Sequence, residues 1–284
     1  MVDRNSIDRR QFLQSGLLAA TLVAAGRLPL LASETGTGSG IDTSGDEYAA
    51  KPIRSYLMGF SPPEKSLRAR GQYTLNYNIV HWNGGTRATD RMSNSVVGSV
   101  AIKRRPENDQ VIYEVTQKTQ IGGVDNVIEA QIICNPDELS SLRKWNLRTY
   151  HTGPGGGIEP LSQIKESGGV GNGSIRVSRE GYSCDYTAEN PVVTRWTVLD
   201  YLIRKADPAL SVAFDLLEDL SLFKPNQSLA YDGETHVTLK GGKTVTLQTY
   251  AQTGEGILPI HYLLDANGCP QLITSSILSW ALSG

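Results

Sequence analysis

The chain has 284 residues, of which 39% are hydrophobic and 20% are charged, and its formal net charge is −2. This length allows one large β domain or two smaller domains. The nearly balanced charge argues against a general nucleic-acid-binding protein and against a protein held on anionic membranes by a basic surface.

The N-terminal segment carries a pair of arginines followed by an apolar run. Residues 8–14 read Asp-Arg-Arg-Gln-Phe-Leu-Gln, and residues 17–25 are mostly apolar. This pattern resembles the twin-arginine export motif, which is matched by Arg9, Arg10, Phe12 and Leu13. Asp8 and Gln14 depart from the motif. The apolar run has the length of a signal-peptide core, whereas a spanning helix needs about 20 residues.

The resemblance implies that residues 1–26 are a signal peptide with an N-terminal signal helix. The twin-arginine translocase would then carry the folded protein to the periplasm or the exterior. Residues 24–26 and 31–33 are alternative cleavage sites, and an uncleaved anchor is a further alternative. Proteins on this route often load a cofactor before export, but the sequence contains no recognisable cofactor motif. No later segment is long and apolar enough to span a membrane.

Residues 27–70 are expected to be a linker and a loosely packed segment, because residues 33–46 are rich in Gly, Ser and Thr. Alternating strands are expected after it, at Gln72–Trp82, Val96–Lys103, Gln110–Thr119, Val124–Cys134 and Lys144–Thr149. Each strand has one apolar face, which is typical of an antiparallel sheet with its other face in water. We expect residues 71–284 to form a single antiparallel β domain.

Two glycine-rich stretches, residues 153–157 and 168–173, interrupt this pattern. They lack the Gly-Lys-Ser/Thr ending of a phosphate-binding loop. A mobile surface loop is therefore expected, which would be able to cover the mouth of a pocket. Ser174–Ser178 and Tyr182–Thr187 follow as a predicted hairpin.

One helix is predicted near residues 195–206. Thr194 can cap it, and apolar residues recur at spacings of three and four: Trp196, Leu199, Leu202, Ile203 and Ala206. Asp207-Pro208 ends the helix. Its apolar stripe should pack on the sheet.

A strand at Leu210–Glu218 brings three carboxylates close together in sequence, at Asp215, Glu218 and Asp219. Glycosidase chemistry needs two carboxyl groups about 5–10 Å apart across a cleft. Neighbours at the end of one strand seldom face each other in that way. We expect solvated charges here, and Asp215 and Asp219 remain candidates for an acid–base pair.

The C-terminal stretch is predicted to be a meander with strands at Glu234–Lys240, Thr244–Ala251, Leu258–Leu264 and Pro270–Ala281. If Gln248 lies opposite His261, then His236, Gln248 and His261 form one row across three strands. The two histidines would then be roughly 9–10 Å apart, which is long for sharing a metal whose bonds to nitrogen are about 2 Å. Solvent-facing histidines are the simpler interpretation, and a metal or ligand pair is the alternative.

Three cysteines, Cys134, Cys184 and Cys269, allow at most one intramolecular disulfide, and the sequence does not select the pair. Cys134 shares a face with Ile128, Ala130 and Ile132, so we expect it to be buried as a small apolar side chain.

The order of strands, a helix that begins at a tryptophan, and further strands resembles the half-barrel of exported bacterial proteins, including lipoprotein-localisation carriers. The resemblance covers roughly residues 70–284 and is one of pattern. It implies a large curved antiparallel sheet with a helix on its concave side and an apolar concave face that can hold a lipid. It transfers no catalytic residue, and a function argued from fold is only an analogy.

These observations favour an exported, non-catalytic binding or interaction protein that holds an apolar or amphipathic ligand on a concave sheet. The alternative is a cell-envelope hydrolase that acts on a glycan or an ester, with His236, His261, Asp215 and Asp219 as candidate catalytic residues. A third class is an accessory subunit that packs on a partner. The sequence does not specify the ligand, the cofactor or the oligomeric state.

Overall fold

The computed structural model of the chain describes residues 67, 71–81, 96–121, 123–153, 155–238, 242–275 and 278–283. All of them lie within Gly38–Gly284. The expected signal peptide with Arg9, Arg10, Phe12 and Leu13 lies outside the described residues, as does the predicted linker apart from Leu67.

Fifteen strands form one sheet. They are β1 (Tyr73–His81), β2 (Val96–Glu107), β3 (Gln110–Ile121), β4 (Val124–Cys134), β5 (Leu142–Thr152), β6 (Ile164–Gly171), β7 (Ser174–Arg179), β8 (Tyr182–Thr187), β9 (Val192–Val193), β10 (Ser211–Glu218), β11 (Leu222–Thr238), β12 (Thr244–Gly254), β13 (Ile260–Leu264), β14 (Pro270–Thr274) and β15 (Leu278–Leu282). Helical segments among the described elements are η2 (Pro160–Ser162) and α3 (Arg195–Lys205).

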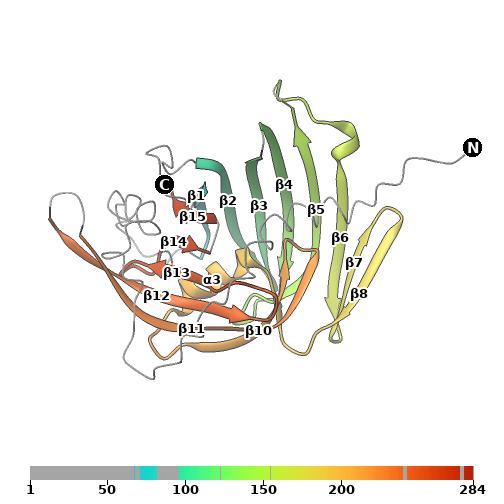
Figure 1. The fold of residues 1–284 in the computed structure, drawn as a ribbon. Coiled ribbons are helices and arrows are strands. Elements are labelled where there is room, and N and C mark those ends of the chain that lie inside the picture. Colours follow the sequence, from blue (N-terminus) through green and yellow to red (C-terminus); the bar gives the residue numbers. More distant parts are fainter. Residues whose placement is uncertain are drawn as a thin grey trace, which may run out of the picture. The chain divides into compact units, whose positions relative to one another are not determined.

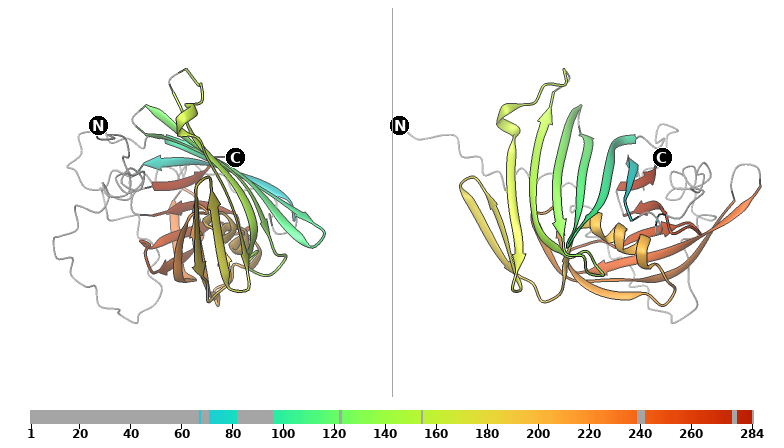
Figure 2. Two further views of the ribbon diagram at one scale, coloured as in Figure 1. Left: turned by 90° about the vertical axis from the view of Figure 1, so that its right-hand side faces the viewer. Right: turned by 180° about the vertical axis from the view of Figure 1, so that it is seen from behind.

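The sheet runs in the order β8 to β1, then β15 to β9, so that β1 and β15 join its two halves. Neighbouring strands are antiparallel, except for the short parallel pair β9 and β10. β8 and β9 are the two edges, so the sheet is not closed. Figures 1 and 2 show it bending around α3. The prediction of a large curved antiparallel sheet with one packed helix is confirmed.

Because side chains alternate along each strand, the sheet has two faces. We call the face on the side of α3 the inner face and the opposite one the outer face. On β3, β4 and β5 the inner row Val115, Ala130 and Leu147 is buried. The adjacent outer row on the same strands is Glu114, Gln131 and Asn146. Because side chains two apart share a face, the apolar periodicity of these strands is what turns one face toward the core.

α3 begins at a capping box formed by Thr194 and Thr197, in which each side chain bonds the backbone of the other. The expected cap and apolar stripe are thus confirmed, and Trp196, Leu199 and Leu202 are buried. Within the described residues, no helix is both long and apolar enough to cross a membrane.

The glycine-rich stretch at residues 168–173 is not the surface loop that we expected, because β6 runs through Gly168 and Gly169. A Cβ at Gly168 would lie 2.1 Å from the ring of Trp145. Glycine at this position lets the buried indole lie directly against the neighbouring strand. The predicted strand Pro270–Ala281 is also divided, into β14 and β15.

Candidate functional site

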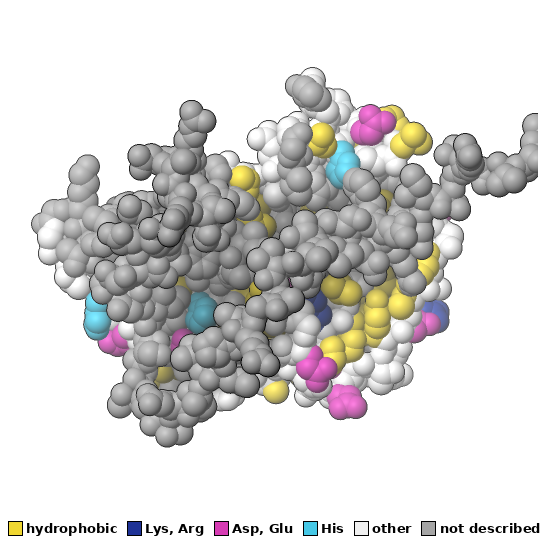
Figure 3. All heavy atoms as spheres, in the orientation of Figure 1, with side chains coloured by type: hydrophobic (Ala, Val, Ile, Leu, Met, Phe, Trp, Pro, Cys, Tyr) yellow, Lys and Arg dark blue, Asp and Glu magenta, His cyan; other side chains and the backbone are white. Residues whose placement is uncertain are grey.

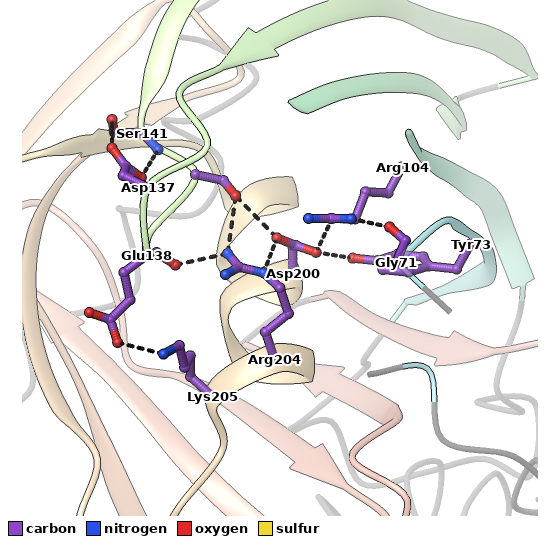
Figure 4. Close-up of polar contacts among 10 residues, drawn as sticks. Gly71, Tyr73, Arg104, Asp137, Glu138, Ser141, Asp200, Arg204 and Lys205 are labelled. Carbon is purple, nitrogen blue, oxygen red and sulfur yellow. Dashed lines mark hydrogen bonds and ion pairs between the residues drawn. The ribbon is translucent and has the colours of Figure 1, made fainter. Parts of the chain in front are cut away.

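Polar side chains are buried between α3 and the first strands, and we call them the Asp200 cluster (Figure 4). Asp200 projects from the helix and is 0% exposed. Its Oδ1 lies 2.6 Å from Nε of Arg104 and accepts a hydrogen bond from the hydroxyl of Tyr73 at 2.7 Å. Its Oδ2 accepts hydrogen bonds from Nε of Arg204 at 2.7 Å and from the hydroxyl of Ser140 at 3.1 Å.

The Asp200 cluster attaches the helix to the sheet. Arg104 belongs to β2, Tyr73 to β1 and Ser140 to the segment between β4 and β5. A second ion pair, between Lys205 and Glu138 at 3.2 Å, joins the end of α3 to that same segment. Since both oxygens of Asp200 are occupied by partners within the protein, the cluster is organised as a structural anchor. The sequence pattern missed it, although Asp200 lies four residues after Trp196 on the apolar side of the helix.

Two hollows lie on the outer face, over strands β3 to β7. Their volumes are about 790 Å³ and 480 Å³. They share four lining residues, Gln131, Asn146, Ser167 and Ser178, and we call these four the outer groove. The four shared residues are polar, and the rest of the lining is mixed: the first hollow is also lined by Val115, Ala130 and Leu147 and by charged residues of both signs. Neither hollow is therefore the purely aliphatic cavity that a lipid-binding concave face predicts.

The inner face of β6, β7 and β8 carries apolar side chains that are only partly buried, and we call this surface the open inner face. Val170, Cys184 and Tyr186 are half-buried, as is Phe223 of the neighbouring β11, and Tyr182 is 38% exposed. The rings of Tyr186 and Phe223 lie 5.4 Å apart. Figure 3 shows hydrophobic side chains gathered in a band over β7 and β8, at the right of the view.

A polar group borders the open inner face. Glu166 of β6 is buried and lies opposite Arg179 of β7. Its carboxylate accepts a hydrogen bond from the hydroxyl of Ser221 at 2.7 Å. Burial raises the pKa of Glu166, and the bond from Ser221 and the charge of Arg179 oppose that shift. The guanidinium carbon of Arg179 lies 4.6 Å from the ring centre of Tyr182.

Asp215 is buried rather than solvated, contrary to our expectation. Its carboxylate accepts backbone N–H bonds from Glu189 and Asn190, each at 3.0 Å, and from Asn226 at 2.9 Å. It also accepts a bond from the side-chain amide of Asn190 at 3.2 Å. Asp215 thus joins the loop between β8 and β9 to the irregular part of β11 that lies opposite it. Sequence spacing gave no sign of this, because the donors come from segments 11 to 26 residues away.

Glu218 and Asp219 lie where β10 ends. Glu218 forms ion pairs with Arg195 at 2.5 Å and with Lys224 at 2.6 Å. Asp219 is an exposed residue in the left-handed region, at φ 48°, in the turn that leads to β11. Asp215 is buried against the loop between β8 and β9, whereas Asp219 is exposed, so the two carboxylates that we considered as a pair lie in different surroundings.

The predicted row of His236, Gln248 and His261 does not form. His236 lies opposite Thr246, and Gln248 lies opposite Leu264. His261 lies opposite Ala251, which is five positions farther along β12 than Thr246. An odd separation along a strand places the two histidines on opposite faces, at a distance along the strand of roughly 16 Å. The β11–β12 register and the β12–β13 register thus both differ from those that the predicted row required.

Each histidine has its own local partner. Nδ1 of His236 lies 3.0 Å from the hydroxyl of Thr246. Nε2 of His261 lies 3.7 Å from a carboxylate oxygen of Asp232. Burial lowers the pKa of His261, and the charge of Asp232 opposes that shift. Across the described part of the chain, no group of three or more His, Cys, Asp or Glu side chains is placed to hold a metal ion.

The three cysteines are unpaired. Cys134 is buried, as expected, and so is Cys269, whereas Cys184 is half-buried. Burial raises the pKa of Cys269 to about 12 and raises that of Cys134 as well. A thiol with a raised pKa is a poor nucleophile, because the thiolate is the reactive form.

No protein-family model matches the chain, and no curated protein matches it. Among solved structures, it is similar to a DUF1089 family protein from Pseudomonas aeruginosa, with 14% sequence identity and a TM-score of 0.37. The match covers 66% of this chain and 94% of that one. A likeness at that TM-score leaves function to be argued from the residues themselves.

Proposed function

We propose that the protein is an exported, non-catalytic binding protein that holds an apolar or amphipathic ligand on the open inner face. The observation that supports this most is the partial exposure of Tyr182, Cys184 and Tyr186 on one face of β8. Contiguous exposed apolar surface is uncommon on soluble proteins and often marks a place where something binds.

The side chains at the border of this surface favour an amphipathic ligand. Val170, Cys184 and Tyr186 offer apolar contact, whereas Arg179 and Glu166 supply polar groups at the level of Tyr182. A ligand with an apolar body and a polar or acidic head would match both parts, since an arginine can hydrogen-bond a carboxylate or phosphate.

A non-catalytic role is favoured by the dispersal of the titratable candidates. Asp215 is engaged by backbone N–H groups, and His236 and His261 lie on opposite faces. A general acid and base have to reach the same reacting atom. We therefore prefer a binding protein to a hydrolase.

Binding can be tested by titrating the protein with cis-parinaric acid, a fluorescent fatty acid. Saturable binding is expected, and Tyr182→Ser should weaken it about five- to tenfold through the loss of apolar contact. Tyr182→Phe should bind like the parent. Leu161→Ser is the matched control, because Leu161 is 81% exposed and belongs to η2 rather than to the strands of the open inner face. An absence of binding, or equal loss in the control, would count against the proposal.

The proposed export rests on Arg9, Arg10, Phe12 and Leu13, with the twin-arginine translocase as partner and the periplasm or exterior as destination. Replacing both arginines by lysine keeps the charge and should leave the full-length precursor inside the cell. Fractionation of a bacterial host that has this translocase would measure it. Unchanged export of the double variant would remove the support for this route.

A further inference from the structure

We propose that the outer groove is a second ligand site, separate from the open inner face, and that it binds an extended, uncharged oligosaccharide. The register of the sheet aligns the side chains that form this site. Gln131, Asn146, Ser167 and Ser178 lie directly opposite one another on β4, β5, β6 and β7. Ser183 continues the row onto β8.

From β4 to β8 this row consists only of amides and hydroxyls, and on β3 it ends at Glu114, which pairs with Lys103 at 3.3 Å. Each amide or hydroxyl side chain can both donate and accept hydrogen bonds, which is what sugar hydroxyl groups require. Among the described residues, Gln131, Asn146 and Ser167 are exposed, and none of the four groove side chains forms a hydrogen bond or an ion pair within the protein. Their hydrogen-bonding capacity is therefore available to a ligand.

The spacing of the row suits an elongated ligand. Neighbouring strands are about 4.8 Å apart, so five positions extend over roughly 19 Å. Gly169 leaves the surface low on one side of Ser167, because it has no side chain. An oligosaccharide that crosses the strands would meet one polar side chain on each of them.

The charges beside the row are of both signs, which argues against a charged ligand. On one side Arg148 lies 3.6 Å from Glu129, and on the other Arg176 pairs with Asp185 at 2.8 Å. Nucleic acid and sulfated glycans bind surfaces with a strong positive excess. A wholly apolar ligand is disfavoured too, because it would cover the four polar side chains shared by both hollows without supplying hydrogen-bond partners for them.

The test is a titration of the isotope-labelled protein with cellohexaose, with chitohexaose and with a sulfated heparin hexasaccharide, followed by NMR. The side-chain NH₂ signals of Gln131 and Asn146 report directly on the groove. Hydrogen bonds that compete with water are individually weak, so a Kd on the order of 1 mM is expected. An uncharged hexasaccharide should shift these signals and the backbone signals of β4 to β7.

Gln131→Ala combined with Asn146→Ala should weaken that binding about tenfold, as expected for the loss of two hydrogen bonds. Gln72→Ala is the matched control, since Gln72 is an exposed glutamine outside the groove. The proposal is overturned if neither uncharged sugar shifts the signals at a sugar concentration about ten times the expected Kd. It is also overturned if the double variant binds equally well, or if only the sulfated sugar binds. Binding of cis-parinaric acid should be unaffected by the double variant.

Discussion

Nε of Arg104 on β2 lies 2.6 Å from Oδ1 of Asp200 on α3, and this contact joins the helix to the sheet. The side chain of Asp200 is 0% exposed and that of Arg104 is 9% exposed, so the two charges depend on each other for compensation. Arg104 also donates a hydrogen bond to the backbone carbonyl of Gly71, at the start of the first strand. One ion pair thus fixes both the helix and the beginning of β1.

Asp200→Ala should destabilise the protein strongly, because it leaves Arg104 buried without its anion. The expected loss in the free energy of unfolding is about 3–5 kcal/mol. Denaturant unfolding followed by circular dichroism would measure it. Asp109→Ala is the control, since the side chain of Asp109 is 81% exposed and lies 3.6 Å from Arg143. That variant should change stability by about 1 kcal/mol or less. Equal stability of the two variants would show that the cluster is not the anchor.

Gly168 provides a second prediction, about packing rather than charge. A Cβ there would lie 2.1 Å from the Trp145 ring and 2.4 Å from the backbone oxygen of Arg176. Gly168→Ala should therefore lower the free energy of unfolding by about 1–3 kcal/mol, because the added methyl group overpacks the interior. Gly171 lies on the same strand, and a Cβ added there has no atom within 4 Å. The free energy of unfolding of Gly171→Ala should therefore differ from that of the parent by no more than about 0.5 kcal/mol. A neutral Gly168→Ala would mean that the indole does not lie against β6.

Burial of His261 predicts a pH dependence of stability. The pKa of His261 is lowered from 6.5 by burial, with partial opposition from Asp232. As pH falls through 6.5 the unfolded chain takes up this proton while the folded protein does not. The contribution of His261 to stability is thus complete above pH 6.5 and is lost between 6.5 and the lower pKa of the folded state.

Unfolding curves measured from neutral pH to below pH 6.5 would test this. His261→Gln should remove that part of the decrease in stability. Asp232→Asn should enlarge it, because the carboxylate that favours the charged imidazole is gone. A steeper decrease in the His261→Gln variant, or a shallower one in Asp232→Asn, would contradict the assigned environment.

Much of the sheet was predictable because its strands alternate regularly. Val124–Cys134 and Tyr182–Thr187 were predicted with the bounds that the structure has. β6 was missed because two glycines, Gly168 and Gly169, remove the side-chain alternation on which such a prediction depends. The reason for Gly168 is its contact with Trp145 on the neighbouring strand, which no local pattern records.

The candidate sites were harder to predict, because register and burial place their side chains. The row of His236 and His261 required a strand register that β11 and β12 do not adopt. The outer groove could not be predicted, because Gln131, Asn146 and Ser167 each look like ordinary outward-facing residues in the sequence. Only the alignment of their strands in the sheet brings them into one row. Asp200 is the exception, because a carboxylate within the apolar stripe of a predicted helix can be recognised in the sequence.

Ligand binding on the open inner face can be tested directly by native mass spectrometry of the purified protein, before and after incubation with palmitate and with a diacyl phospholipid. We expect a lipid-sized adduct that persists under gentle conditions, disappears on denaturation and is reduced in the Tyr182→Ser variant but not in Leu161→Ser. Protein that remains at its bare mass after both incubations, or an adduct that is equally abundant in Tyr182→Ser, would contradict binding on the open inner face.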